Sequence, residues 1–478
     1  MLFNSLTFAL FFPIVTTLYF LTPHRWRWLL LLVASSIFYM AFVPVYILIL
    51  VFTILVDYAA GLLIESSHGR RRRGWLLASL AANIGVLAIF KYYGFIADNL
   101  LWLKSSFNVD LTLPPWNIVL PLGLSFHTFQ AMAYTIEVYR GRVPAERHLG
   151  YYALYVMFYP QLVAGPIERP DHLLPQLRIE HRFEYGRVVA GLKRMALGLF
   201  KKVVIADQLA RTVDLVYADP TQWTGLALML AAVFFAWQLY YDFSGYSDVA
   251  IGSAQVMGFE LTRNFRSPFT SQTLSDFWRR MHISLMSWFR DYVYIPLGGS
   301  RTTTPRWCFN LLVAFTISGL WHGAQWTFVL YGTLSGVMVL VGEITRPWRK
   351  RMGFARGGWP AAAITFGLFA ASLVVFRAPS LADAVHTLTH LHTGLLDDFA
   401  TIAGGGVIAG LSGLGLVAIL SVVGLQLWVD ALDNTKDAFV RLAAWPATAR
   451  FAVYFVLVYS CLAAGSMRSP QQFIYFQF

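Results

Sequence analysis

Residues Trp28 to Ile64 read WLLLLVASSIFYMAFVPVYILILVFTILVDYAAGLLI, a nearly uncharged stretch long enough for two membrane-spanning helices. Comparable apolar stretches recur at Trp75 to Ile96, Ile364 to Phe376, Gly405 to Val429 and Phe451 to Gly465. Since one span needs roughly 20 apolar residues, the lengths of these stretches predict about 11 spans in the chain. Core helices of a soluble enzyme would carry a charged face, and these stretches lack one.

The composition supports the same class. Of 478 residues, 57% are hydrophobic and only 13% are charged, which leaves too little polar surface for a soluble globule. The segment Phe8 to Phe20 is apolar but lacks the features of a cleaved signal, so we expect it to be the first retained helix. We therefore predict an all-α integral membrane protein with one polytopic domain over residues 1–478.

Positive charge marks the expected cytoplasmic side. Lys and Arg number 37 against 25 Asp and Glu. The surplus gathers in short loops such as Arg70 to Arg73 and the run from Arg346 to Arg356, which should face the cytoplasm. The basic residues form no continuous stripe between stacking aromatics, so a nucleic-acid partner is not expected. Cys308 and Cys461 lie in apolar stretches and suggest neither a disulfide framework nor a zinc site.

Two regions are more polar than the rest. Between Pro160 and Asp207, basic residues alternate with Leu, Val and Met, which predicts amphipathic helices at the lipid interface; these residues are Lys193, Arg194, Lys201 and Lys202. The second region, Asp242 to Arg306, is rich in Arg, Asp, Ser, His and Gly. Ionisable groups are costly in a membrane, so this region should carry the chemistry.

The segment Leu320 to Ala324, LWHGA, places His322 between two apolar spans. An ionisable group at that depth is costly and is often functional; the alternative is a histidine that only packs against a neighbouring helix, and the residues around His322 favour a functional role. Gly323 would leave room for a ligand.

A second histidine lies in the segment Ser275 to Ser284, SDFWRRMHIS. On a helix Asp276 and Arg280 are four residues apart and can pair, and Trp278 and His282 would share one face. Further on, Gly298 and Gly299 would allow a sharp turn. An interfacial helix that directs its arginines to lipid phosphates fits the same spacing equally well.

Two further clusters are ambiguous. Asp242 and Asp248 in YDFSGYSD should orient a histidine or an arginine, because carboxylates close to a membrane usually pair with one. The alternative, nucleophilic attack by a serine, fits poorly, because Gly245 to Val249 lacks the second glycine of a hydrolase elbow. His386, His390 and His392 with nearby aspartates could form a metal cluster, but we expect no metal.

Several motifs together resemble the membrane-bound O-acyltransferase superfamily, in particular its bacterial branch of alginate O-acetylation and teichoic acid D-alanylation. Besides the two histidine segments, they are LPLGLSFHTF (Leu120 to Phe129), FYPQLVAGP (Phe158 to Pro166), YDFSGYSD (Tyr241 to Asp248), NFRSP (Asn264 to Pro268) and the final FIYFQF.

The resemblance implies a ring of tilted helices, with interfacial and re-entrant helices, around a central tunnel. His322 matches the family's invariant histidine and His282 its second histidine, so we expect both to be catalytic. Further supporting or tunnel residues would be Trp321, Asp242, Asp276, Trp278, Arg280 and Tyr475. The sequence departs from the branch at His127, where a tyrosine is typical, and at Met281, where a tryptophan is typical.

The resemblance also implies the reaction. Acetyl-CoA in the cytoplasm would be the donor, His322 the base, and a separate extracytoplasmic transferase the partner that acetylates a polysaccharide such as alginate, cellulose or peptidoglycan. The location would be the bacterial inner membrane. Alternatives are transfer to a lipid or protein hydroxyl, a transporter, or a scaffold without catalysis. We find no inverted repeat of the kind that favours transport.

Overall fold

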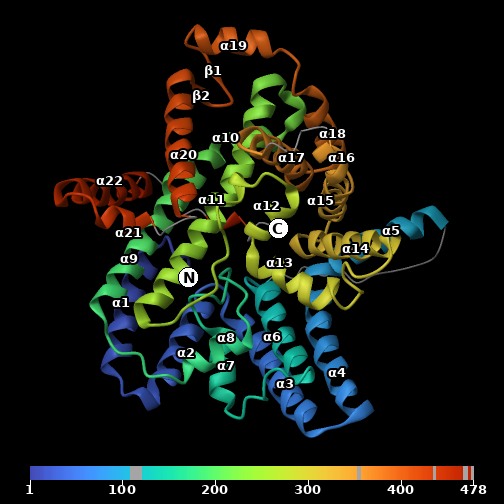
Figure 1. Cartoon of the computed structure of the whole chain (residues 1–478), viewed down its shortest axis with the longest axis vertical. Helices are drawn as coiled ribbons and strands as arrows, with labels where there is room; N and C mark the ends of the chain where they lie inside the picture. The colour runs from blue at the N-terminus through green and yellow to red at the C-terminus, as the bar shows by residue number, and fades with distance from the viewer. Residues whose placement is uncertain (108–120, 352–356, 434–437, 467–471, 475–478) are drawn as a thin grey trace. The chain divides into compact units, whose positions relative to one another are not determined.

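A computed structural model of the chain is shown in Figure 1. It describes residues 1–107, 121–351, 357–433, 438–466 and 472–474. The chain forms two compact units. Unit 1 comprises Met1–Met195 and Val249–Thr262, and unit 2 comprises Ala196–Asp248 and Arg263–Gln477. The prediction of one domain stays a prediction.

The secondary-structure elements in the described residues of unit 1 are all helices. Its elements are α1 (Leu6–Leu21), α2 (His24–Met40), η1 (Pro44–Tyr46), α3 (Ile47–Ser66), α4 (Gly69–Leu87), η2 (Ala88–Tyr92), α5 (Tyr93–Phe107), α6 (Leu124–Tyr139), α7 (Leu149–Met157), α8 (Pro170–Leu177) and most of α9 (Tyr185–Leu199).

Unit 2 contains the remaining helices and one antiparallel pair of two-residue strands. Its first elements are η3 (Phe200–Ala206), α10 (Asp207–Ala218), η4 (Pro220–Gln222), α11 (Gly225–Met257, whose end belongs to unit 1), η5 (Pro268–Thr270), α12 (Leu274–Arg280), α13 (Ile283–Phe289), η6 (Arg290–Tyr294), α14 (Thr304–His322) and α15 (Trp326–Ile344). The others are α16 (Arg346–Arg351), α17 (Trp359–Arg377), α18 (Leu381–His390), α19 (Leu395–Ala403), β1 (Val407–Ile408), β2 (Leu411–Ser412), α20 (Gly413–Asp433), α21 (Ala438–Ala443) and α22 (Ala447–Ser466).

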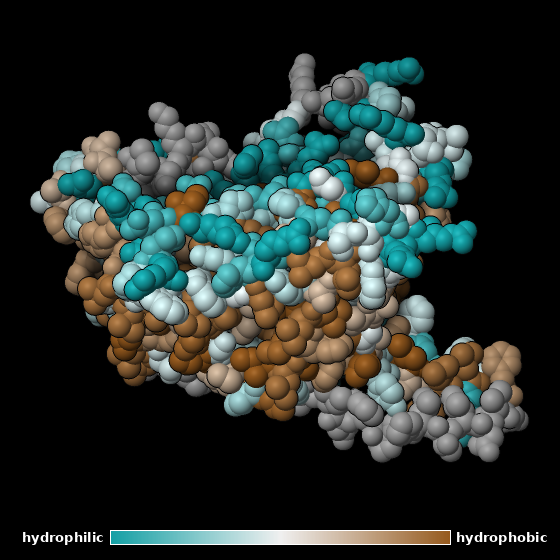
Figure 2. All heavy atoms as spheres, turned by 90° about the horizontal axis from the view of Figure 1, so that it is seen from below, coloured by the Kyte–Doolittle hydropathy of each residue, from teal (hydrophilic) through white to brown (hydrophobic). Residues whose placement is uncertain are grey.

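Seven helices in the described part of the chain are long and apolar enough to cross a membrane. They are Pro44–Ser66, Gly69–Phe107, Gly225–Met257, Trp326–Ile344, Trp359–Arg377, Gly413–Leu432 and Ala447–Gly465. Large apolar side chains remain exposed on several, for example Leu48 on α3 and Phe451 on α22, and Figure 2 shows apolar side chains gathered over a broad part of one face. The predicted all-α membrane class is confirmed, while the ring, the tunnel and the count of 11 stay predictions.

Helices α3, α4 and α6 pack together in unit 1 and bring two of the arginine-rich loops to one end of the bundle. Arg72 donates to the carbonyl oxygen of Tyr139 at 2.7 Å, and Arg147 pairs with Glu65 at the end of α3. The loop of Arg70 to Arg73 was predicted to face the cytoplasm, which stays a prediction, and the loop that carries Arg147 lies at the same end of the bundle.

The motif YDFSGYSD lies inside α11, which runs for 33 residues. One local prediction for unit 2 was wrong. Lys201 and Lys202 are not at the lipid interface: they are 6% and 9% exposed and form ion pairs with aspartates. The cause is η3, a π-helical turn that interrupts the α-helical periodicity on which the prediction of an amphipathic helix depended.

Candidate active site

The hairpin of α14 and α15 determines where His322 lies. Gly319 and Gly332 face each other so closely that a Cβ atom on either would collide with the backbone of the other helix. Small residues allow this approach of two helices in a membrane. A hydrogen bond of 2.9 Å between the hydroxyls of Thr316 and Thr333 adds a polar link. His322 is the last residue of α14 and is 9% exposed.

His282 lies between two short helices rather than on one. Because α12 ends at Arg280 and His282 has a positive φ of 51°, the predicted shared helical face with Trp278 does not exist. The His282 Nδ1 lies 3.3 Å from Asn264 Oδ1, an acceptor that also receives the Ser284 N–H at 3.1 Å. Asn264 therefore places the imidazole proton on Nδ1 and leaves Nε2 as the basic atom.

Aromatic rings enclose both histidines. The His282 ring meets Phe243 edge to face, with centroids 4.4 Å apart, and lies 6.1 Å from Trp321. The His322 ring lies 5.6 Å from Phe376. Trp321, which was predicted as a supporting residue, thus packs beside both imidazoles.

The two histidines line one cavity, called here the histidine cavity. Its walls come from α11 to α15 and α17 and consist of Leu239, Trp278, Met281, His282, Leu285, Met286, Phe315, Ser318, Gly319, His322, Tyr331, Gly332, Ser335, Phe369 and Phe376. Apart from the imidazoles, this lining, as far as the chain is described, contains no titratable acid or base other than Tyr331. The cavity volume is about 20 Å³, which is room for roughly one water molecule.

A larger cavity, called here the vestibule, shares part of its wall with the histidine cavity. Its volume is about 320 Å³, and it is lined by Ser275, Trp278, Arg279, Ile283, Met286, Ser287, Arg290, Phe315 and Val339. Trp278, Met286 and Phe315 line both cavities. On α15 the histidine cavity is lined by Ser335 and the vestibule by Val339, which are about 6 Å apart at the rise of an α-helix.

The vestibule lies near the arginine-rich end of α15. Ser275 donates to Glu343 at 2.5 Å, and Glu343 pairs with Arg346 at 3.4 Å. Arg346 begins the basic run that was predicted to face the cytoplasm. Arg279 and Arg290 add two guanidinium groups to the vestibule.

The other predicted site residues take varied positions. Asp276 and Arg280 form the predicted pair, with a closest distance of 2.9 Å, and neither lines the histidine cavity or the vestibule. The room expected beside Gly323 is filled, because the Phe328 ring occupies the place of a Cβ atom. Gly298 and Gly299 have the positive φ angles expected of a sharp turn. Tyr475 lies outside the described residues.

Asp242 contacts neither a histidine nor an arginine in the hydrogen bonds and ion pairs of the described residues. Its carboxylate pairs with Lys202 at 2.5 Å and accepts the N–H of Ile474 at 2.6 Å. Lys202 also pairs with Asp207 at 2.9 Å, and the preceding Lys201 lies between Asp248 and Asp430. The sequence offered no signal for these pairs, because most of the partners are distant in the chain.

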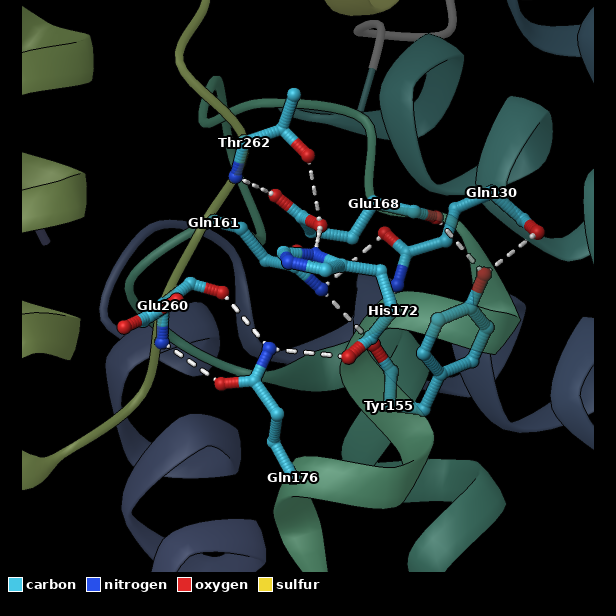
Figure 3. A network of polar contacts seen from close by, with 8 residues as sticks. All are labelled: Gln130, Tyr155, Gln161, Glu168, His172, Gln176, Glu260 and Thr262. Carbon is cyan, nitrogen blue, oxygen red and sulfur yellow. Dashed lines mark hydrogen bonds and ion pairs between the residues drawn. The ribbon is translucent and has the colours of Figure 1, made fainter.

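Unit 1 holds a polar network of a different kind (Figure 3). The carboxylate of Glu168, which is fully buried, accepts the Thr262 N–H at 2.5 Å and lies 2.6 Å from His172 Nδ1. Tyr155 donates to the Glu168 carbonyl oxygen at 2.9 Å, and Gln161 donates to the Tyr155 carbonyl oxygen at 2.9 Å. The hydrogen bond to Glu168 raises the pKa of His172. This network fixes the FYPQLVAGP loop.

The remaining histidines are apart from the two cavities and take part in local contacts. Within the described ranges no group of three His, Cys, Asp or Glu residues could hold a metal ion. His386 and His390 stack with ring centroids 4.1 Å apart, and Asp398 instead accepts the N–H of Leu226 at 2.8 Å. His127, in α6 of unit 1, contacts the Gly123 carbonyl oxygen at 3.2 Å.

Comparisons with known proteins identify the family to which the chain is similar. A sequence model of the membrane-bound O-acyltransferase family matches residues 143–381, a range that contains both His282 and His322. The chain is 40% identical over 391 residues to the probable alginate O-acetylase AlgI of Azotobacter vinelandii, which covers 80% of this chain and 76% of that protein. It is 35% identical over 398 residues to the peptidoglycan O-acetyltransferase of Helicobacter pylori (77% and 73%). It is 27% identical over 248 residues to the teichoic acid D-alanyltransferase of Bacillus subtilis (50% and 62%).

Proposed function

The chain belongs to the membrane-bound O-acyltransferase family, and we propose that it takes acetyl groups from cytoplasmic acetyl-CoA and passes them across the bacterial inner membrane for O-acetylation of a polysaccharide. As a family member it is an O-acyltransferase and a multi-pass membrane protein. One observation carries the proposal. His282 and His322 line the same cavity, and part of the wall of that cavity also lines the vestibule, which contains two arginines.

The vestibule supports a phosphate-bearing thioester as donor. Arg279 and Arg290 present guanidinium groups, which suit phosphate oxygens in charge and geometry. The adjoining histidine cavity is small and walled by aromatic and aliphatic side chains, which favours a short acyl group over a long one. Together they suit a large, charged carrier with a small acyl group at its end.

The proposed reaction uses His322 as general base. Its imidazole takes the proton of the acceptor hydroxyl as the hydroxyl oxygen attacks the thioester carbonyl carbon. The carbon–sulfur bond then breaks, and the thiolate leaves with the proton that the imidazole returns. The described lining holds neither Asp nor Glu, which supports this role, because no carboxylate there would hold the imidazole in its charged form.

His282 is proposed to assist from the same lining. Asn264 fixes its tautomer, so its Nε2 is the atom available to orient a reacting group or to relay a proton. Trp321 and Trp278 pack around this centre, and Asp276 with Arg280 would stabilise the end of α12.

The acceptor is proposed by analogy with relatives that are named for alginate and peptidoglycan O-acetylation. An extracytoplasmic transferase would receive the acetyl group and deliver it to the polymer. Tyr475 is proposed to contact that partner or to carry the acyl group transiently. Unchanged transfer by the Tyr475→Phe variant would exclude a relay through the tyrosine hydroxyl.

The test is incubation of membranes with acetyl-labelled acetyl-CoA, followed by measurement of both the labelled acceptor and the free CoA thiol. His322→Ala should lower both by about 10²–10⁴-fold, the range of general base catalysis, with the amount of protein in the membrane unchanged. The matched control is His68→Ala, which removes an exposed imidazole at the start of α4.

Each alternative gives a different result. A transporter or a scaffold would release no CoA thiol, and full activity of His322→Ala would remove His322 from the mechanism. Label recovered in lipid or protein would replace the polysaccharide with another hydroxyl acceptor.

A further inference from the structure

Two consecutive lysines in η3 are each held between two aspartates. Lys201 lies 3.0 Å from Asp248 and 3.3 Å from Asp430, while Lys202 lies 2.5 Å from Asp242 and 2.9 Å from Asp207. All six side chains are at most 15% exposed. The two lysine clusters are thus alike in composition and burial.

The Lys202 cluster also binds the backbone of residues 472–474. Lys202 donates to the Gln472 carbonyl oxygen at 3.2 Å, and Asp242 accepts the Ile474 N–H at 2.6 Å. Phe473 and Ile474 are 1% and 2% exposed. An ion pair whose two members bind the backbone two residues apart holds that backbone in place.

The held segment also reaches the histidine cavity through one ring. The Phe473 ring lies 5.4 Å from Phe243 and 4.8 Å from Tyr246. Phe243 is the ring that meets His282 edge to face at 4.4 Å. Phe243 is therefore packed between residues 472–474 on one side and an imidazole of the proposed active site on the other.

We propose that Lys202 and Asp242 form a clasp that holds residues 472–474 in the core of unit 2, and that the held segment positions His282 through Phe243. Lys202, Asp242 and Phe473 are thus positioning residues that touch neither substrate nor cofactor. The positioning part of the inference rests on the proposed role of His282, whereas the clasp itself does not.

The clasp is tested by labelling. In a protein with Cys308 and Cys461 replaced by serine, an Ile474→Cys thiol should react slowly with a maleimide, because position 474 is buried. Asp242→Ala should accelerate labelling by roughly tenfold or more, since a hydrogen bond to a charged group is lost. Asp248→Ala removes a similarly buried partner from the Lys201 cluster and should leave labelling slow.

The effect on His282 is tested without disturbing the ion pair. Ile474→Pro removes the N–H that Asp242 accepts, while Ile474→Ala shortens the side chain and keeps the N–H. The proline variant should show a kcat for acetyl transfer at least roughly tenfold below that of the alanine variant, with the KM for acetyl-CoA unchanged. Phe473→Ala should behave like the proline variant, and Phe473→Leu should restore part of kcat.

Equal labelling rates in the Asp242→Ala and Asp248→Ala proteins would overturn the clasp. Equal kcat values for the proline and alanine variants would overturn the positioning of His282. Both outcomes can be distinguished from failure of the proposed function. If His322 is not the base, the His322→Ala protein keeps its acetyl transfer, and the rate of maleimide labelling at position 474 does not change.

Discussion

His172 in unit 1 and His322 in unit 2 both lie on helices, but their surroundings differ. His172 meets a fully buried carboxylate and belongs to a network in which Thr262 donates to Glu168 and Gln176 donates to the His172 carbonyl oxygen. His322 lines a cavity whose described walls are aromatic and aliphatic and carry no carboxylate. A histidine paired with a carboxylate is held charged and fixes structure, whereas a histidine beside a neutral cavity can exchange a proton with a ligand.

The largest loss of kcat among these variants is expected when the hydrogen-bond acceptor of His282 is removed. Asn264→Ala should lower kcat for acetyl transfer by about 100-fold, the lower end of general acid–base catalysis, because His282 loses the acceptor that fixes its tautomer. The KM for acetyl-CoA should not change. Ser284→Ala is the control, since it removes another donor to Asn264 Oδ1 and keeps the contact with His282. Equal losses in the two variants would contradict a specific role for this contact.

The size of the histidine cavity should set the acyl length. One extra methylene in a tight apolar pocket is worth about 10–200-fold in kcat/KM, so acetyl-CoA should be preferred over propionyl-CoA by such a factor. Phe369→Ala enlarges the cavity and should reduce the preference to a few-fold. Phe366, on the same helix, stacks on Trp237 outside the lining, and Phe366→Ala should keep the preference. An unchanged preference in Phe369→Ala would place the acyl group elsewhere.

A smaller effect is expected in the vestibule. Arg279→Ala should raise the KM for acetyl-CoA roughly fivefold at low salt, because a solvent-accessible guanidinium contributes only up to about 1 kcal/mol to binding a phosphate. The effect should shrink as salt screens the charge. Arg301→Ala, at an exposed position outside the lining, controls for net charge. An unchanged KM in the Arg279→Ala protein would show that acetyl-CoA binds at another surface.

The smallest effect concerns the charged histidine of unit 1. Glu168 raises the pKa of His172 above the value of about 6.5 in an unfolded chain, so the pair stabilises the fold below that pH, and the stabilisation is lost as pH rises through the folded pKa. His172→Gln should lower the melting temperature at about pH 6 and much less at about pH 9. The loss should stay under about 1 kcal/mol, since the ring is partly exposed.

His68→Gln, at an exposed position, should have no effect at either pH. A difference between wild type and His172→Gln that is the same at both pH values would show that the ion pair contributes nothing.

What could be predicted from the sequence depended on short-range patterns. Long uncharged stretches indicated the membrane class, and a spacing of four residues indicated the Asp276–Arg280 pair. The end of an apolar stretch placed His322 at the boundary between two helices. Each of these features is a property of residues within a few turns of one another.

Contacts between distant segments could not be predicted in this way. Lys201 pairs with Asp430, and Asp242 binds Ile474, although 229 and 232 positions separate the two pairs. Asn264 was noticed as part of a motif, but its role depends on a backbone turn at His282 with a positive φ, which no propensity indicates. The room beside Gly323 was misjudged because Phe328, five residues later, folds back over it.

The π-helical turn η3 amounts to one residue inserted into an α-helix. Deleting a single residue there would restore a regular helix and remove the widened turn. Successive residues of a regular helix lie about 100° apart around its axis, so the side chains in and beside the turn would change direction. Lys201 and Lys202 could then no longer both meet their aspartates. The length of this turn is therefore as important to the two lysine clusters as the lysines themselves.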